Sequence, residues 1–105
     1  MRLWMVDPKV LCRKHLLGEH VESHMFMGSI RKGISLKGYV SGGLVEVHHV
    51  KVRHDALAQE MTRRGYNHHS PMHEQALPEA GRVDKVGNLQ ELARRCSECK
   101  KMQEV

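Results

Sequence analysis

The feature that most constrains the fold is a helical spacing of side chains between residues 44 and 65. Side chains three and four positions apart lie on one face of an α-helix. A strand over residues 45–52 (VEVHHVKV) is the alternative, because β-branched residues are dense there. The period continues beyond that stretch, and Gly65 stands where a left-handed residue commonly ends a helix, so we predict a helix. Its face consists of Leu44, Val47, Val50, His54, Leu57 and Met61.

A second helix is predicted from Asp7 to about residue 32. Asp7 is typical of an N-cap, and Pro8 suits the first helical position because it has no amide hydrogen to leave unpaired. Gly33 ends the helical pattern. A break in this helix near Cys12 or Gly28 is compatible with the same pattern. The apolar stripe of this helix consists of Leu16, Leu17, Val21, Met25, Phe26 and Ile30.

A last helix is predicted to begin with Asn88 as its N-cap, because Glu91 stands three positions later, as in a capping box. Residues 33–43 and 66–87 are rich in glycine or proline and predict connections. The sequence therefore predicts an all-α fold, in a single domain over residues 1–105 with about three helices.

The chain has 17 lysines and arginines against 12 acidic residues, a net charge of +5. A basic protein favours a polyanionic partner, and nucleic acid is favoured over membrane because no stretch is apolar and long enough to span a bilayer. A merely solubilising surface is the alternative. No secretory signal is seen, and the 3 cysteines are an odd number, so we expect a cytoplasmic protein.

The segment HLLGEHVES places His15, Glu19 and Glu22 on one helix face, at spacings of four and three. Two carboxylates that lie close together raise the pKa of one of them, which suits general acid–base catalysis. On spacing alone, a solvated helix face is the alternative.

Three short motifs follow one another along the chain: His15-Leu16 with Glu19 and Glu22, the pair Arg31-Lys32, and the helix end Arg64-Gly65-Tyr66-Asn67. In this order they resemble the pyrimidine-dimer DNA glycosylases of the endonuclease V type. The resemblance covers roughly residues 1 to 70. It implies an all-α fold whose N-terminal arm packs between helices.

The resemblance also implies an activity, that of a DNA repair glycosylase with AP-lyase activity. The nucleophile in that family is the N-terminal α-amine, here that of Met1, which forms a Schiff base with the sugar of the damaged nucleotide. Free α-amines titrate near pH 7.7–8.0, so a useful fraction is neutral at physiological pH. Glu22 would assist sugar opening and β-elimination, with His15 and Glu19 in support.

The partner implied is double-stranded DNA with a lesion or an abasic site, from which a nucleotide is flipped. The residues expected to face the DNA are Arg2, Arg31, Lys32, Arg64, Tyr66 and Asn67. A monomer without a cofactor is expected. The chain departs from the family at Met1-Arg2, where the family begins with a small residue after removal of methionine, and at Val21, where the family has an arginine. Its C-terminal CSECKKMQEV also has no aromatic residue. A non-catalytic DNA-binding module of the same fold is therefore an alternative.

Cys96 and Cys99 have the spacing of half a zinc site, and His68, His69 and His73 are histidines that could complete it. A small zinc-binding protein is thus a further alternative. The two cysteines also share the apolar face of the last predicted helix, where cysteine behaves as a small apolar residue. We expect core packing, and no metal site, for these cysteines and for Cys12, with Trp4 anchoring the N-terminal arm.

Overall fold

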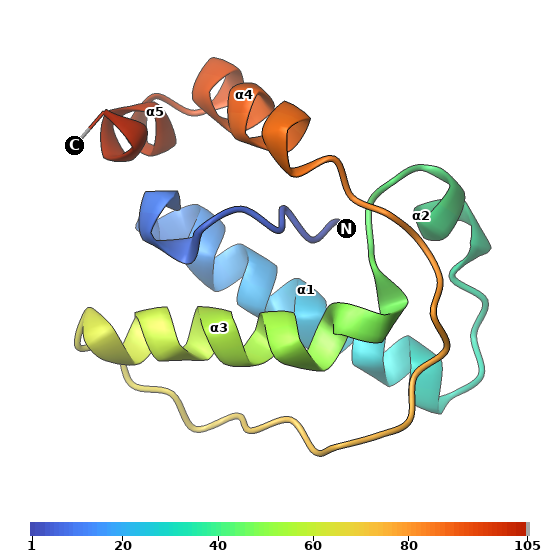
Figure 1. Ribbon diagram of the computed structural model, residues 1–105. Helices are drawn as coiled ribbons and strands as arrows, with labels where there is room; N and C mark the ends of the chain where they lie inside the picture. The colour runs from blue at the N-terminus through green and yellow to red at the C-terminus, as the bar shows by residue number, and fades with distance from the viewer. Residues whose placement is uncertain (105) are drawn as a thin grey trace.

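The computed structural model describes residues 1–104, and all of its regular structure over that range is helical (Figure 1). The elements are the 3₁₀ helix η1 (Pro8–Val10), α1 (Arg13–Arg31), α2 (Lys37–Ser41), the 3₁₀ helix η2 (Val47–His49), α3 (Val50–Arg63), α4 (Lys85–Arg95) and α5 (Ser97–Gln103). The all-α prediction is confirmed, with five α-helices where about three were expected. Within the described part of the chain, no helix is long and apolar enough to cross a membrane.

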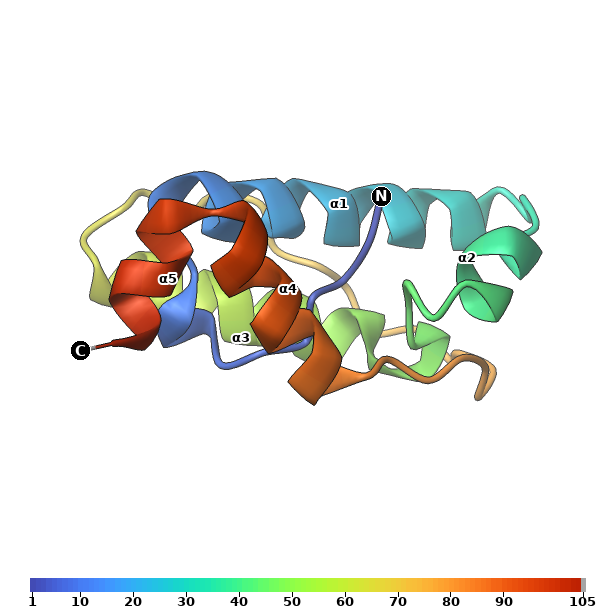
Figure 2. The same cartoon turned by 90° about the horizontal axis from the view of Figure 1, so that it is seen from above.

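The N-terminal arm, residues 1–6, lies between the pair α1–α3 and the pair α4–α5 (Figures 1 and 2). Leu3 is completely buried, and its backbone amide donates to the Leu44 carbonyl at 2.8 Å. Trp4 is buried as well, and its carbonyl accepts a hydrogen bond from the Asn88 side chain at 2.9 Å. The expectation that the arm packs between helices is confirmed, and Trp4 is one of its anchors.

Two apolar clusters form the core, one at each end of the α1–α3 pair. Leu16 and Leu57 belong to the first cluster, and Phe26 and Val50 belong to the second. Positions between these residues on both helices carry a buried polar layer. Its buried polar side chains are Glu19, His20, Ser23, Arg53 and His54.

The buried face of α1 differs from the predicted stripe. Val21 and Met25 were expected to face the core but are 56% and 51% exposed. The buried positions of α1 are Leu16, Glu19, His20, Ser23, Phe26 and Met27. Because glutamate and histidine are hydrophilic, their side of the helix was expected to be exposed. In the middle of α1 the predicted apolar stripe therefore lies on the side that is in fact exposed. Burial is tolerated here because these polar groups have partners.

Helix boundaries follow the predicted caps at some ends and not at others. The Asp7 side chain accepts from the Lys9 amide at 3.0 Å, as an N-cap does, but η1 stops before α1 begins. Asn88 was predicted to begin the last helix, yet Asp84 is the N-cap of α4 and accepts from the Gly87 amide at 3.0 Å. The predicted last helix is also split at Cys96, which ends α4 and caps α5.

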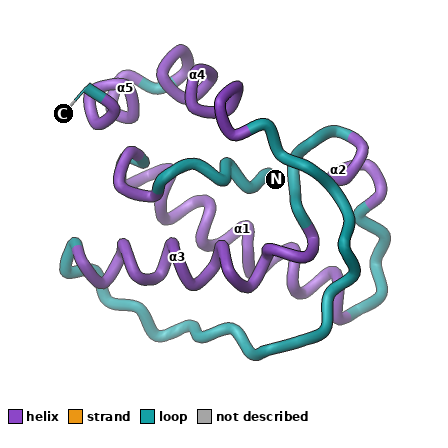
Figure 3. Tube along the Cα trace, in the orientation of Figure 1, coloured by secondary structure: helices purple, strands orange, loops and turns teal. Residues whose placement is uncertain are grey.

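The long connection between α3 and α4 is irregular, as predicted, and it passes around the α1–α3 pair before it reaches α4 (Figure 3). It is fixed to the segment before α3, since the Val47 amide donates to the Ala80 carbonyl at 2.8 Å. Gly81 has φ +91°, and a Cβ there would lie 2.1 Å from the Val45 carbonyl oxygen. Only glycine fits this crossing, which sets the direction in which the chain enters α4.

The connection before α3 was predicted as a loop over residues 33–43, but it contains the short helix α2. The stops predicted at Gly33 and Gly65 are confirmed, because both residues have positive φ, at +71° and +83°. The chain at Leu44 is not helical, so the helix predicted from residue 44 begins later, at η2 and α3.

Candidate active site

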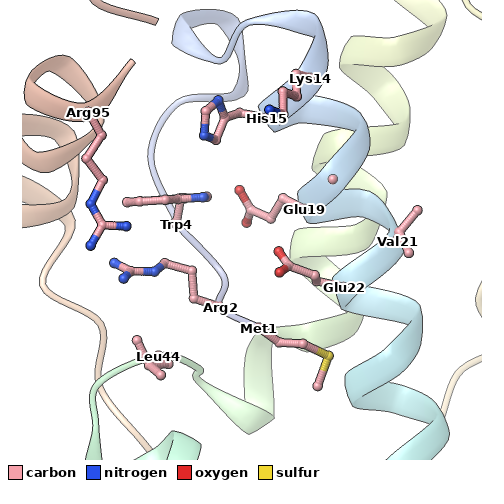
Figure 4. Close-up of a pocket in the computed structure, with 11 residues that line it drawn as sticks. Met1, Arg2, Trp4, Lys14, His15, Glu19, Val21, Glu22, Leu44 and Arg95 are labelled. Carbon is pink, nitrogen blue, oxygen red and sulfur yellow. The ribbon is translucent and has the colours of Figure 1, made fainter.

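A pocket of about 630 Å³ lies beside the N-terminal arm (Figure 4). Four segments far apart in the sequence form it: the arm, the first half of α1, the chain between α2 and η2, and the end of α4. Its lining consists of Met1, Arg2, Trp4, Lys14, His15, Gly18, Glu19, Val21, Glu22, Leu44 and Arg95. The candidate catalytic residues Met1, Glu22, His15 and Glu19 are thus all brought to one pocket.

Glu22 faces this pocket from α1, next to Met1 (Figure 4). Burial raises the pKa of the Glu22 carboxyl, and the negative charge of Glu19 acts in the same direction. The positive N-terminal amine and the backbone and guanidinium of Arg2 act against this, but the pKa stays above its ordinary value. A carboxyl with a raised pKa beside an amine is placed to exchange protons in general acid–base catalysis.

Glu19 lines the same pocket but is committed to a partner in the core. Its two carboxylate oxygens accept from the guanidinium of Arg53, at 2.5 Å from Nε and 2.9 Å from Nη2. The remaining Nη1 of Arg53 donates to the Val6 carbonyl at 2.6 Å. Arg53 therefore fastens the N-terminal arm to α1, and Glu19 holds the pocket wall rather than offering a free carboxylate.

His15 lies at the upper end of the pocket (Figure 4), where its Nδ1 points to two cysteines. Burial lowers the pKa of His15, as does the charge of Lys14, while Glu19 opposes this. The ring of Trp4 lies edge-on to His15, with 6.0 Å between the ring centroids. The lowered pKa favours the neutral form of the His15 imidazole.

Three basic side chains bring positive charge to the pocket. The guanidinium of Arg2 lies over the Trp4 ring, 4.3 Å from its centroid, and is 3.4 Å from the Glu91 carboxylate. Lys14 and Arg95 were not singled out from the sequence. Lys14 is four residues before Gly18 and eight before Glu22, a spacing that could have placed it on the pocket face. No spacing in the sequence indicated Arg95, because it reaches the pocket only through the tertiary packing of α4.

The other residues expected to face DNA do not line this pocket. Arg31 and Lys32 are exposed at the far end of α1, where Arg31 donates to the Gln75 side chain at 3.2 Å. Asn67 is exposed after the end of α3. Arg64 is largely buried: it donates to Glu60 at 2.7 Å and to the Leu11 carbonyl at 2.7 Å.

A basic groove adjoins the pocket and contains Tyr66. The guanidinium of Arg13 lies over the Tyr66 ring at 4.8 Å from its centroid. Lys14 lines both the groove and the pocket. The groove is lined by Cys12, Arg13, Lys14, Arg63, Arg64, Tyr66, Glu98 and Met102.

A histidine cluster made of His20, His24, His54 and His68 lies on the opposite side of α1, since a residue advances 100° around a helix. The ring centroids of His20 lie 4.9, 5.0 and 4.8 Å from those of His24, His54 and His68. Burial and the charges of the other three histidines lower the pKa of His20 to about 4. His24 has a lowered pKa as well, chiefly through burial.

Among residues 1–104, three groups of side chains hold their metal-binding atoms within 4.8 Å of one another. In the histidine group, His54 already contacts the Asp55 carboxylate at 2.8 Å and the Ser70 carbonyl at 3.0 Å. In the glutamate group, Glu46 accepts from the Val83 amide at 2.9 Å. The groups are Cys12, His15, Cys96 and Cys99; His20, His54 and His68; and Glu46, His48 and His49.

The zinc alternative from the sequence paired the two C-terminal cysteines with the wrong histidines. His68 contacts His20, with 2.9 Å between their Nε2 atoms, and His69 and His73 are exposed. The neighbours of Cys96 and Cys99 are Cys12 and His15. The spacing of Cys12 and His15, with two residues between them, was the signal in the sequence that could have identified this group.

Comparison with known proteins shows the family to which this chain belongs. The family model of the pyrimidine dimer DNA glycosylases matches residues 1–74, which is more than half of the chain. The protein belongs to the pyrimidine dimer DNA glycosylase family. The resemblance seen in the three sequence motifs is thereby confirmed. No match was found among curated proteins or among solved structures.

The part that matches the pyrimidine dimer DNA glycosylases contains the arm, α1, α2 and α3 and ends before α4. Met1, His15, Glu19 and Glu22 all fall inside it. The two C-terminal helices lie outside it, yet Arg95 completes one wall of the pocket. The site is therefore built from family residues and closed by a C-terminal segment that the family model does not cover.

Proposed function

We propose that this protein is a DNA repair glycosylase with AP-lyase activity, acting on a damaged base such as a pyrimidine dimer. The observation that carries the proposal is the pairing of Met1 with Glu22, whose pKa is raised, in one pocket of a chain from this family. The membership of the family makes DNA the substrate, and the pocket supplies a nucleophile and a proton carrier at the same place.

The reaction proposed begins with the neutral amine of Met1 attacking C1′ of the damaged nucleotide. The new C1′–N bond replaces the bond to the base, which leaves with the bonding electron pair. Glu22 then gives a proton to the sugar ring oxygen, the ring opens, and loss of the amine proton leaves a Schiff base. The Glu22 carboxylate next takes a proton from C2′, and the 3′ phosphate leaves. Water finally hydrolyses the Schiff base and frees the enzyme.

The size and charge of the pocket agree with this reaction. A volume of about 630 Å³ is within the range of about 300–1,000 Å³ in which small ligands bind. It can receive a nucleotide taken out of the base stack, as an enzyme acting on a base within a duplex requires. Arg2, Lys14 and Arg95 at its rim provide positive charge for the flanking phosphates.

The surface proposed to bind the duplex extends from the pocket in two directions. The groove with Arg13, Lys14 and Tyr66 continues it at the start of α1. Arg31 and Lys32 lie at the other end of the same helix, and Asn67 is exposed beyond α3. We assign Arg64 to holding the turn before α1, because its hydrogen bonds go to Glu60 and to backbone carbonyls.

The test is borohydride trapping on duplex DNA that carries an abasic site. Untagged protein should give a reduced covalent crosslink, since borohydride converts the Schiff base to a stable amine. An N-terminal tag converts the Met1 amine to an amide and should abolish the crosslink, whereas the same tag at the C-terminus should leave it. Peptide mapping should place the crosslink on Met1.

Two results would oppose the proposal. A crosslink that survives the N-terminal tag would move the nucleophile to a lysine. DNA binding without any crosslink in the untagged protein would indicate a non-catalytic DNA-binding module of the same fold.

A further inference from the structure

Three cysteines and a histidine from the two ends of the chain meet in one cluster. Cys12 and His15 lie at the start of α1, and Cys96 and Cys99 at the start of α5. The Cys12 Sγ is 3.8 Å from the Cys96 Sγ and 3.2 Å from the His15 Nδ1. The Cys99 Sγ is 3.5 Å from the same Nδ1. All four ligand atoms lie within 4.8 Å of one another.

The 3.8 Å sulfur–sulfur distance and the 3.5 Å sulfur–nitrogen distance match the edges of a tetrahedron around zinc, and the 3.2 Å distance between Cys12 and His15 is shorter. Zinc binds sulfur at about 2.3 Å and imidazole nitrogen at about 2.0–2.1 Å in tetrahedral protein sites. Such a site places two sulfurs about 3.8 Å apart and a sulfur and a nitrogen about 3.5–3.6 Å apart. The 3.8 Å separation of the Cys12 and Cys96 sulfurs is also far longer than a disulfide of about 2.05 Å.

The backbone around the cluster is arranged alike on its two sides. Cys12 caps α1 and accepts from the His15 amide at 3.5 Å, and Cys96 caps α5 and accepts from the Cys99 amide at 3.4 Å. The Cys12 amide in turn donates to the Cys99 sulfur at 3.3 Å. Each sulfur thus has a backbone N–H directed at it.

Apolar packing alone does not account for this arrangement. Cysteines that only fill a core need no common orientation, yet here three sulfurs and one imidazole nitrogen turn toward one point. His15 belongs to the polar pocket on its other side, so its ring stands between the pocket and the cluster.

We propose that Cys12, His15, Cys96 and Cys99 bind one zinc ion. Three thiolates and an imidazole fill all four tetrahedral positions, which is typical of a structural site, and thiolates select zinc over harder cations. The ion fastens α4 and α5, which lie outside the family match, to the first turn of α1. In that position it holds Arg95 against the pocket and keeps His15 beside it.

The experiment is metal analysis of the full-length protein purified under reducing conditions from zinc-supplemented culture. We expect about one zinc per chain. Cys99→Ser and His15→Gln should each reduce the zinc content at least severalfold, and His69→Gln, an exposed histidine outside the cluster, should leave it unchanged. Replacing zinc with Co²⁺ should give the visible absorption and the thiolate charge-transfer band of a tetrahedral site.

Thiol accessibility gives a second measurement that does not depend on how the variants fold. In the native protein the 3 cysteines should react slowly with a thiol reagent and become fast when a strong chelator is added. Chelation should also lower the midpoint of thermal unfolding by roughly 10 °C or more, since structural zinc contributes folding free energy.

Three outcomes would overturn the zinc site. One is a zinc content below about a tenth of an equivalent in reduced protein after addition of Zn²⁺, with no Co²⁺ spectrum. Another is undiminished zinc in the His15→Gln and Cys99→Ser variants. The third is fast reaction of all the thiols without chelator. None of these measurements depends on glycosylase activity, so the zinc site and the proposed function can fail separately.

Discussion

The two sides of α1 carry polar clusters that differ in almost every physical respect. On the side of the N-terminal arm, the carboxylate of Glu22 meets the Met1 amine, Arg2 and Lys14 around an open pocket. On the other side, the rings of four histidines pack against one another. The Ser70 carbonyl accepts hydrogen bonds from two of them, His24 and His54.

The difference lies in the charges that each cluster brings together. In the pocket, the carboxyl of Glu22 lies near the Met1 amine, whose charge is of opposite sign, and burial raises the pKa of Glu22. In the histidine cluster, burial and then the charges of the three neighbouring histidines lower the pKa of His20 to about 4. Residues of one helix thus line the pocket of the proposed reaction on one side and a cluster of histidines on the other.

The largest effect is expected from Glu22→Gln. The amide keeps the size of the side chain but cannot exchange a proton, so strand cleavage at an abasic site should fall by about 10²–10⁴. DNA affinity should hold or improve, because a negative charge near phosphate is removed. Single-turnover cleavage and a binding titration measure the two quantities, with His20→Gln as the control from the other side of α1. A parallel loss of cleavage and binding would make Glu22 a structural residue.

The next effect concerns the buried pair that lies between the two sides. Arg53→Met leaves the Glu19 carboxylate buried without its partner and should lower the free energy of unfolding by about 3–5 kcal/mol. Urea denaturation measures this, and adding Glu19→Gln to the Arg53→Met variant should recover part of the loss. Arg31→Met, at an exposed position, should change stability by less than about 0.5 kcal/mol. Equal losses in the two arginine variants would contradict a structural role for the pair.

The histidine cluster should make stability depend on pH. Because the pKa of His20 is lowered from 6.5 to about 4, the unfolded chain binds more protons than the folded one below pH 6.5. Stability is therefore fully present above pH 6.5 and is lost as the pH falls toward 4. We expect a loss on the order of 1–2 kcal/mol, after allowance for solvent screening of the partly exposed His24 and His68.

Urea denaturation between pH 7 and 5, compared with the same measurement on the His20→Gln variant, gives this contribution, because His15, Glu22 and His24 also have shifted pKa values but are present in both proteins. Carboxyls with a lowered pKa, such as Glu60 at about 2, change stability only below their unfolded value near 4.5. His20→Gln should flatten the dependence, and His69→Gln, an exposed histidine, should not. An unchanged slope in His20→Gln would place the pH sensitivity elsewhere.

The smallest effect is expected from Lys14→Ala on the pocket side. Lys14 lies where the pocket and the basic groove meet, so its loss should remove about one phosphate contact. The slope of log affinity against log salt should become shallower by about 0.9, with a severalfold loss of affinity at low salt. Lys100→Ala, exposed on α5, is the control. An unaltered salt slope in Lys14→Ala would remove this residue from the DNA surface.

Much of the fold and part of the site could be predicted from the sequence. The ends of α1 and α3 are marked by Gly33 and Gly65, and the helical period over α3 excluded the strand alternative. These signals are local, because caps and side-chain periods depend on residues a few positions apart. Glu22 and Met1 were expected to act together only through the family resemblance, since spacing on α1 says nothing of where the arm runs.

Only the tertiary structure decided which polar groups are partners. Glu19 looked like a second catalytic carboxylate, but Arg53, 34 positions away, takes both of its oxygens. Cys96 finds Cys12, 84 positions away, and Arg95 reaches the pocket from a helix outside the family match. Such contacts depend on how α1, α3 and α4 cross, which many buried side chains settle together. A local sequence pattern shows which face of a helix is apolar, but it does not show which residues of other segments will contact that face.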